Sequence, residues 1–416
     1  MTISRRAFLK NGALAVVGTS AIPSFLTRSV LAQTANLRAG GRRLVVIFQR
    51  GAADGLNIVI PHGEPGYYQM RPTIAIPREQ VIDLDGFFGL HPALAPLQPL
   101  WKQGHLALVH AAGSPDTTRS HFDAQDYMES GTPGLKSTPD GWLNRALQAE
   151  DEQRRTRDTS PFRAVAVTNA VPRTLKGLVP AVALRNLGDF RALDTYDKLA
   201  NDPFQAMYDD SSNVTMRNAG KEAFHAMQML RSANAAGYTP APGANYPGSS
   251  LGQSLKQIAQ LMKSNFGVEA AFADVGGWDH HHNEGGVNGQ LGNSLRNYAA
   301  AISAFWTDLG DDAGNTVLVT MSEFGRTARQ NGTGGTDHGH ANVMFVLGGP
   351  VRGGHVYGKW PGLAQEQLYQ GRDLALTTDF RQVLSEAAYK TVGARDLHRV
   401  FPGSTLQSRQ FLNLIA

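Results

Sequence analysis

Histidines and carboxylates gather in two short segments of the C-terminal half of the chain. Five of the 13 histidines fall between positions 280 and 340, in Asp279-His280-His281-His282 and in Asp337-His338-Gly339-His340. In each segment the ligand-type side chains are one or two residues apart, so two of them can reach one ion from a turn. Because the chain has no cysteine, the donors are carboxylates and imidazoles, which suit zinc, manganese, magnesium or iron. The pattern predicts a metal site.

Further candidates for the site stand in the turns that follow apolar runs with the composition of buried strands. They are Asp54 after residues 43–49, Ser120 and His121 after 106–111, and Glu323 and Arg326 after 316–321. The carboxyl ends of parallel strands share one edge of a sheet, where ligands bind in α/β proteins. These side chains are therefore expected to lie close to the two histidine segments.

Each candidate also has an ordinary structural explanation. A strand-end acid such as Asp54 is often a turn or helix cap, and Ser120 is typical of a helix N-cap. Glu323 and Arg326 can pair with each other, and His280 to His282 can form a solvated loop. The number of such turns at strand ends favours the metal site over these alternatives.

The elements that must position these residues alternate along the chain. Apolar runs predict strands at 43–49, 106–111, 164–167, 268–274, 316–321 and 342–347, and helical periodicity predicts helices at 121–129, 251–265 and 291–309. This alternation predicts an α/β fold, a three-layer α/β/α sandwich with a mostly parallel sheet. Residues 33–416 are expected to form one domain, with a cap or insertion around 131–250 that selects the substrate.

The first 32 residues have the layout of an export signal. Ser4-Arg5-Arg6-Ala7-Phe8-Leu9-Lys10 precedes a weakly apolar stretch that ends near Leu26, and the segment closes at Ala32. The paired arginines are typical of a twin-arginine signal. Pro23 and several small polar residues make a stable membrane span unfavourable, and an amphipathic N-terminal helix is the alternative. We expect a periplasmic or otherwise exported protein whose partner during export is the twin-arginine translocase.

The basic character of the chain belongs to this leader. The 39 Lys and Arg residues exceed the 35 Asp and Glu residues by four. The leader holds Arg5, Arg6, Lys10 and Arg28 and no acid, so residues 33–416 have a balance of 35 − 35 = 0. Nothing in this balance favours nucleic-acid binding.

At its motifs the sequence resembles a family of exported bacterial proteins, domain of unknown function 1501, which is grouped with the alkaline phosphatase and sulfatase-like superfamily. The motifs are Arg50-Gly51-Ala52-Ala53-Asp54-Gly55-Leu56-Asn57, Leu90-His91-Pro92-Ala93-Leu94, Arg119-Ser120-His121-Phe122, Gly277-Trp278-Asp279-His280-His281, Met321-Ser322-Glu323-Phe324-Gly325-Arg326 and Gly335-Thr336-Asp337-His338-Gly339-His340. The resemblance spans essentially the whole chain and implies an alkaline phosphatase-like fold.

The resemblance also implies a centre of one or two divalent ions, with zinc, manganese or calcium as candidates. The implied ligands are Asp54 and Glu323 for one ion and Asp279 with His281 for the other, completed by His338 or His340 with Asp337 beside them. Where many relatives have Asp-His, this chain has Glu323-Phe324, and phenylalanine cannot bind a metal. One ion is therefore expected to be weakly held, held through His121 instead, or missing.

For activity, the resemblance implies that Ser120 attacks phosphorus at a helix N-terminus and that Arg326 clamps a phosphate oxygen. The expected function is hydrolysis of a phosphate or related ester, either a small molecule or an envelope polymer. A sulfatase is disfavoured because Ser114-Pro115-Asp116 lacks the required motif. The alternative is a non-catalytic periplasmic or cell-envelope binding or assembly protein on the same fold.

Overall fold

The computed structural model describes residues 14–16, 41–152, 160–187 and 237–416. Its centre is a 10-stranded sheet in the order β1-β8-β7-β9-β2-β10-β11-β6-β12, with β13 also beside β6. The strands of this sheet are β1 Leu14–Val16, β2 Arg43–Gln49, β6 Leu106–Gly113, β7 Ala164–Ala166, β8 Val182–Leu184, β9 Ala270–Val275, β10 Thr316–Ser322, β11 Asn342–Gly348, β12 Val356–Tyr357 and β13 Thr378–Asp379. A separate 3-stranded sheet in the order β3-β5-β4 contains β3 Val59–Ile60, β4 Ile82–Asp83 and β5 Gly89–Leu90.

The central sheet is mostly parallel, with one reversed strand in its middle. Strands β8, β7, β9, β2 and β10 pair in parallel, whereas β11 is antiparallel to both β10 and β6. In the β2–β10 pair Thr316 lies opposite Arg43 and Ser322 lies opposite Gln49, so both strands end together. Because β11 is reversed, its first residue lies at the edge where β2, β9 and β10 end.

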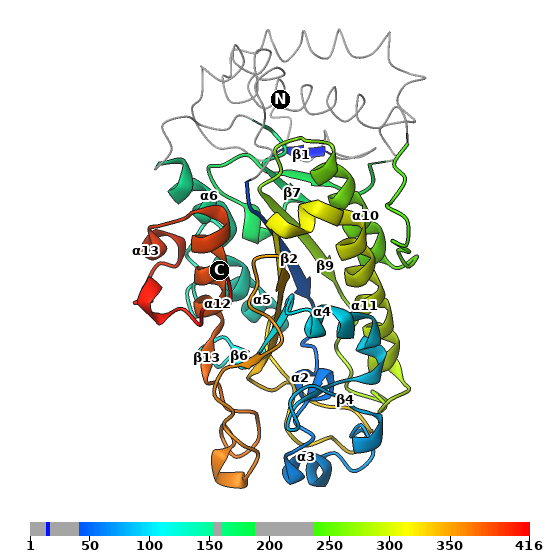
Figure 1. Cartoon of the computed structure of the whole chain (residues 1–416). Coiled ribbons are helices and arrows are strands. Elements are labelled where there is room, and N and C mark those ends of the chain that lie inside the picture. Colours follow the sequence, from blue (N-terminus) through cyan, green and yellow to red (C-terminus); the bar gives the residue numbers. More distant parts are fainter. Residues whose placement is uncertain (1–13, 17–40, 153–159, 188–236) are drawn as a thin grey trace, which may run out of the picture.

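Helices cover both faces of this sheet (Figure 1). The α-helices are α2 Gly55–Ile58, α3 Pro65–Met70, α4 Gln98–Lys102, α5 His121–Ser130, α6 Trp142–Asp151, α10 Ser250–Lys263, α11 Gln290–Leu309, α12 Phe380–Ala387 and α13 Leu397–Val400. The short helices are η2 Arg78–Gln80, η3 Pro92–Leu97, η4 Arg173–Leu175, η6 Gly310–Asn315, η7 Gln365–Gln367, η8 Ala388–Val392 and η9 Ser408–Gln410.

Alternating side chains of β2 divide the interior into two cores. Val45 and Ile47 pack with α10 and α11, while Leu44, Val46 and Phe48 pack with α6 and α12. A fully buried aliphatic or aromatic side chain contributes about 1.5–3 kcal/mol, so both faces of the sheet stabilise the fold. This confirms the α/β sandwich with a mostly parallel sheet.

Local sequence explains the long helices. In α11, Leu291, Leu295, Tyr298, Ile302 and Phe305 recur every three or four residues and are all buried, as one face of a helix requires. The helix ends at Gly310, whose φ of 54° suits glycine. The predicted elements agree with the structure to within two residues at nearly every boundary, whereas the small sheet was not predicted.

The predicted cap and the predicted leader both lie partly outside the described residues. Of the predicted cap or insertion around 131–250, residues 153–159 and 188–236 lie outside the described residues, and the described part contains α6 and the sheet strands β7 and β8. Most of the predicted leader also lies outside the described residues, although β1 pairs with β8. Among the described residues, no helix has the length and apolar character needed to cross a bilayer.

Candidate metal centre

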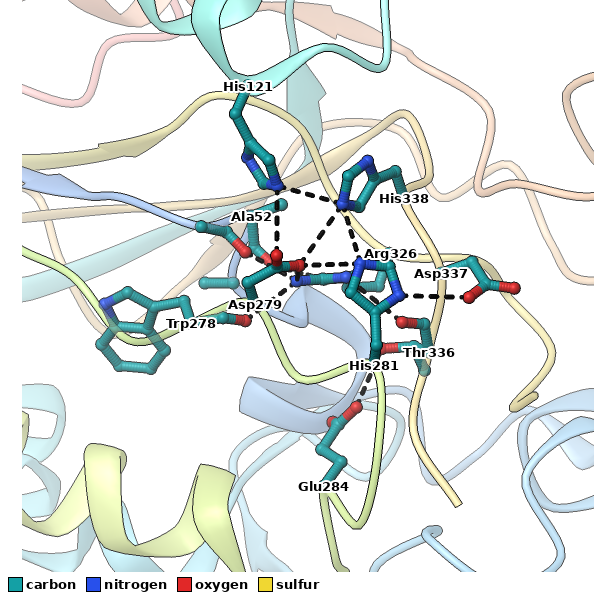
Figure 2. A network of polar contacts seen from close by, with 12 residues as sticks. Ala52, His121, Trp278, Asp279, His281, Glu284, Arg326, Thr336, Asp337 and His338 are labelled. Atoms are coloured by element: carbon teal, nitrogen blue, oxygen red, sulfur yellow. Dashed lines mark hydrogen bonds and ion pairs between the residues drawn. The ribbon is translucent and has the colours of Figure 1, made fainter. Parts of the chain in front are cut away.

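Four ligand-type side chains meet at the edge where the parallel strands end (Figure 2). Nε2 of His338 lies 3.0 Å from Nε2 of His121 and 3.0 Å from Nε2 of His281. The Asp279 carboxylate joins them, with Oδ1 at 3.0 Å from His281 Nε2 and 3.3 Å from His338 Nε2, and Oδ2 at 3.4 Å from His121 Nε2. Three imidazoles and one carboxylate therefore point at one another.

The second ring nitrogen of each histidine is held by an oxygen outside this group. Nδ1 of His121 lies 2.8 Å from Glu323 Oε1, and Nδ1 of His281 lies 3.2 Å from Asp337 Oδ1. Nδ1 of His338 lies 2.9 Å from the carbonyl oxygen of Arg119. Because each Nδ1 faces an acceptor, Nδ1 is the nitrogen placed to donate a proton, and a ring with its proton there directs the lone pair of Nε2 into the group. Histidines that bind metals are oriented in this way.

The separations among His121, Asp279 and His338 fit the ligands of a single ion. With metal–ligand bonds of about 2.1 Å, neighbouring ligands lie about 3.4 Å apart in a tetrahedron and about 3.0 Å apart in an octahedron. The observed 3.0–3.4 Å falls in this range. Lone pairs of neutral imidazoles repel each other at such distances, and a cation between them removes the repulsion. His121, Asp279 and His338 form a group that could hold a metal ion, and His281 contacts two of its members.

Tertiary packing brings the four residues together from three segments. His121 is the first residue of α5, Asp279 and His281 follow β9, and His338 precedes the reversed strand β11. The two loops bind each other through Glu284 N to Gly334 O at 2.9 Å. A Cβ on Gly335 would lie 2.4 Å from the carbonyl carbon of His281, so only glycine allows this approach.

The two carboxylates that contact histidine Nδ1 atoms, Glu323 and Asp337, differ in their exposure to solvent. Glu323 has no exposed side-chain surface and accepts hydrogen bonds from Gly51 N at 2.8 Å and Gln125 Nε2 at 2.9 Å. Burial alone would raise the pKa of Glu323, but these bonds and His121 lower it. The hydrogen bond to Glu323 raises the pKa of His121, which makes this imidazole a stronger ligand. Asp337 is 57% exposed.

Arg326 has a different role from the predicted phosphate clamp. It is buried, and its guanidinium donates to the carbonyl oxygens of Ala52 at 2.6 Å and Gly51 at 2.7 Å and to Asp279 Oδ1 at 2.5 Å. Its partner is therefore Asp279, not Glu323. Although burial would raise the pKa of Asp279, Arg326 lowers it. These contacts anchor Asp279 and leave the guanidinium poorly placed to hold a phosphate.

Asp54 does not join the group. Both of its oxygens bind the Arg71 guanidinium, Oδ2 in a very short contact with Nη1 and Oδ1 at 3.0 Å from Nη2. The pair is fully buried, and although burial would raise the pKa of Asp54, Arg71 lowers it. Burial and the neighbouring Asp54 raise the pKa of Glu284 well above its usual value. The cation beside Asp54 is thus a guanidinium, which corrects the prediction that Asp54 holds an ion.

His340 and Ser120 also differ from the expected arrangement. The His340 ring stacks on Tyr369, with centroids 4.3 Å apart, so His338 and not His340 completes the group. Ser120 is the N-cap residue of α5, but its side chain makes no capping hydrogen bond within the described residues. Its hydroxyl therefore precedes His121 without the capping hydrogen bond that the ordinary structural explanation assigned to it.

Sequence reasoning missed Arg71, Glu284 and Gln125. Gln125 lies one helical turn after His121, a spacing that places both side chains on one face of α5, and this signal was available. Arg71 and Glu284 carried no local signal, because their partners come from distant segments.

Comparison with known proteins places the chain in a family. The model of the family described as "Protein of unknown function (DUF1501)" matches residues 101–400, which is more than half of the chain. The chain belongs to this family. No curated protein matches the chain.

Two solved structures show a distant likeness to this family member. A sulfatase from Pseudoalteromonas sp. has 12% identity and a TM-score of 0.39, over 95% of this chain and 77% of that chain. A phosphonate monoester hydrolase from Silicibacter pomeroyi has 11% identity and a TM-score of 0.32, over 90% of this chain and 76% of that chain. Likeness at this level transfers no activity.

Proposed function

We propose that this member of the DUF1501 family is an exported metal-dependent hydrolase of phosphate or related esters. The observation that carries the proposal is the convergence of three histidine Nε2 atoms on Asp279, with every Nδ1 held by an outer oxygen. Such an arrangement is favourable when a cation lies between the nitrogens.

The donor set narrows the choice of ion. Calcium and magnesium prefer oxygen ligands, whereas three imidazoles and a carboxylate suit zinc or manganese. Arg71 neutralises Asp54, so Asp54 is not a ligand of a second ion. We therefore propose one transition-metal ion per chain. His121, Asp279, His281 and His338 are its ligands, and Glu323 and Asp337 orient them.

Residues around the centre suit an anionic ester. When bound, the ion supplies a Lewis acid that stabilises charge on an ester oxygen. Ser120 is the candidate nucleophile, at the N-terminus of α5, where free N–H groups favour an anion. Arg119 and Arg372 are partly exposed, share the buried carboxylate of Asp373 and adjoin His338. Their positive charge favours a negatively charged substrate.

One observation favours the alternative of a non-catalytic binding or assembly protein. Four protein ligands are typical of structural zinc sites, whereas catalytic sites keep a position open. The four side chains are, however, 23–44% exposed, which leaves one side of the group open to solvent. The two functions therefore differ in whether solvent and substrate reach the ion.

Metal content and turnover together test the proposal. Metal would be measured by mass spectrometry on untagged residues 33–416, in the wild type and in the Asp279→Ala/His281→Ala double variant. Asp311→Ala/His355→Ala, which changes the same residue types at exposed positions, is the matched control. We expect about one ion per chain in the wild type and control and a loss in the double variant. No ion in the wild type after supplying zinc or manganese would overturn the proposal.

The loaded protein would then be assayed with p-nitrophenyl phosphate, bis-p-nitrophenyl phosphate and p-nitrophenyl sulfate. A hydrolase is expected to lose turnover in Ser120→Ala while keeping its metal. Metal binding with no turnover in the wild type would favour the binding protein.

A further inference from the structure

Phe324 packs against two of the metal-binding rings. Its ring centroid lies 5.1 Å from that of His121, at an interplanar angle of 32°, and 5.0 Å from that of His338, at 44°. The side chain is only 4% exposed. Phe324 follows Glu323 directly after β10. These two adjacent residues contact the same imidazole, because Glu323 lies at Nδ1 of His121 and Phe324 packs against its ring.

Phe324 takes no part in either of the two cores that pack against the central sheet. Its apolar neighbours are Ala52 and Ala124, and these three residues form a separate small cluster. The backbone holds the position: Asn342 Nδ2 donates to the carbonyl oxygen of Phe324 at 2.8 Å, and Gly325 N donates to His340 O at 2.8 Å. A large ring is therefore fixed in place where its main contacts are histidines.

We propose that Phe324 is a positioning residue of the metal centre, an inference that rests on the function proposed above. A histidine held only at Nδ1 can still swing about that hydrogen bond. A ring against its face removes this freedom, so the Nε2 atoms of His121 and His338 point at Asp279 before an ion arrives. Ordering ligands in advance raises affinity.

The same ring closes one side of the centre. Its carbon atoms offer no ligand, and the ring packs against both His121 and His338. Asp279 and His281 are 44% and 33% exposed, more than His121 and His338 at 25% and 23%, so solvent reaches the centre more freely at the two side chains that Phe324 does not contact. Phe324, which cannot bind a metal, thus acts on the ion through the histidines that do.

Substitution by an apolar residue without a ring tests this role. Phe324→Leu is expected to weaken zinc binding about tenfold, the lower end of the usual effect of outer residues, and to change the visible spectrum of the cobalt-loaded protein. The matched control is Phe380→Leu, a fully buried phenylalanine of the core that contains β2 residue Phe48. The control is expected to lower the melting temperature without changing the zinc Kd or the cobalt spectrum.

The outcomes separate the inference from the function on which it rests. Absence of metal in the wild type would overturn the metal-dependent hydrolase. If the wild type binds zinc and the Phe324→Leu variant has the same zinc Kd and cobalt spectrum, the positioning role alone is overturned. If Phe324→Leu does not fold, Phe324→Met, which fills similar volume without a ring, is measured in the same way with the same expected result.

Discussion

Glu323 and Asp337 make the same contact with two different histidines of the proposed metal centre but differ in burial. Each accepts a hydrogen bond from Nδ1 of a histidine in this centre, Glu323 from His121 at 2.8 Å and Asp337 from His281 at 3.2 Å. Glu323 is fully buried, whereas Asp337 is 57% exposed. Glu323→Gln and Asp337→Asn remove one charge each with little change of shape, so their comparison isolates the effect of burial on metal affinity.

The expected magnitudes follow from screening by water. Removing a buried partner of a ligand histidine weakens metal binding about 10- to 100-fold, which is about 1.4–2.7 kcal/mol. An exposed ion pair contributes at most about 1 kcal/mol, so Asp337→Asn is expected to weaken binding less than about fivefold. The Glu323 effect is expected to persist in high salt, whereas the Asp337 effect shrinks.

The assay is zinc titration against a chromogenic chelator at pH 7, at low and high ionic strength. Glu386→Gln, which changes a buried glutamate that accepts from Ile415 N at 2.9 Å, controls for the loss of a buried carboxylate. Its zinc Kd is expected to equal that of the wild type. Equal losses in Glu323→Gln and Asp337→Asn, or a larger loss in the exposed variant, would refute the reasoning from burial.

Three further predictions concern stability and processing. Burial lowers the pKa of His110 to about 4; because the folded state then binds fewer protons, the unfolding free energy should fall as pH drops from 6.5 to about 4, by about 3 kcal/mol. Urea unfolding across this range should show a fall in His110→Gln that is smaller than that of the wild type by about 3 kcal/mol, because His91, whose pKa burial also lowers to about 4, contributes in both proteins; equal slopes would contradict this. Arg71→Met leaves Asp54 charged and unpaired, so thermal and urea unfolding should show a loss of about 3–5 kcal/mol while the metal content per chain stays unchanged. A second bound ion in the variant would contradict this expectation and show that Arg71 occupies the place of a metal ion beside Asp54. Replacing Arg5 and Arg6 by lysine should leave the precursor in the cytoplasm, and mass spectrometry of the exported wild type should find an N-terminus at residue 33; export of the variant would argue against the twin-arginine route.

Most of the secondary structure was predictable because its signals are local. A continuous apolar run such as 43–49 is buried on both faces wherever it lies in a parallel sheet, and β2 has these bounds. The helix after Ser120 and the long helix at 290–309 also follow from spacing within one segment. The short strand at 164–167 was predicted and corresponds to β7, whereas β8 was not predicted, because three residues are too few to show a periodic pattern.

The candidate site was predictable in its residue types but only partly in its membership. Asp279, His281 and His338 were proposed as ligands and meet in the structure. His121, an alternative ligand, is a full member, while Glu323 and Asp337 hold ligand rings from outside. His338 joins because β11 is antiparallel, so the start of that strand lies where the neighbouring strands end.

The sequence by itself determined the donors of this protein, imidazole and carboxylate without thiol, and the segments that carry them. Only the tertiary structure decided which of these donors lie together. Asp54 is paired with Arg71, 17 positions further along the chain, and Arg326 is bound to carbonyl groups from Gly51, Ala52 and Trp278. The physical reason is that a buried charge takes the partner that packing brings within reach, and packing depends on segments far apart in the chain.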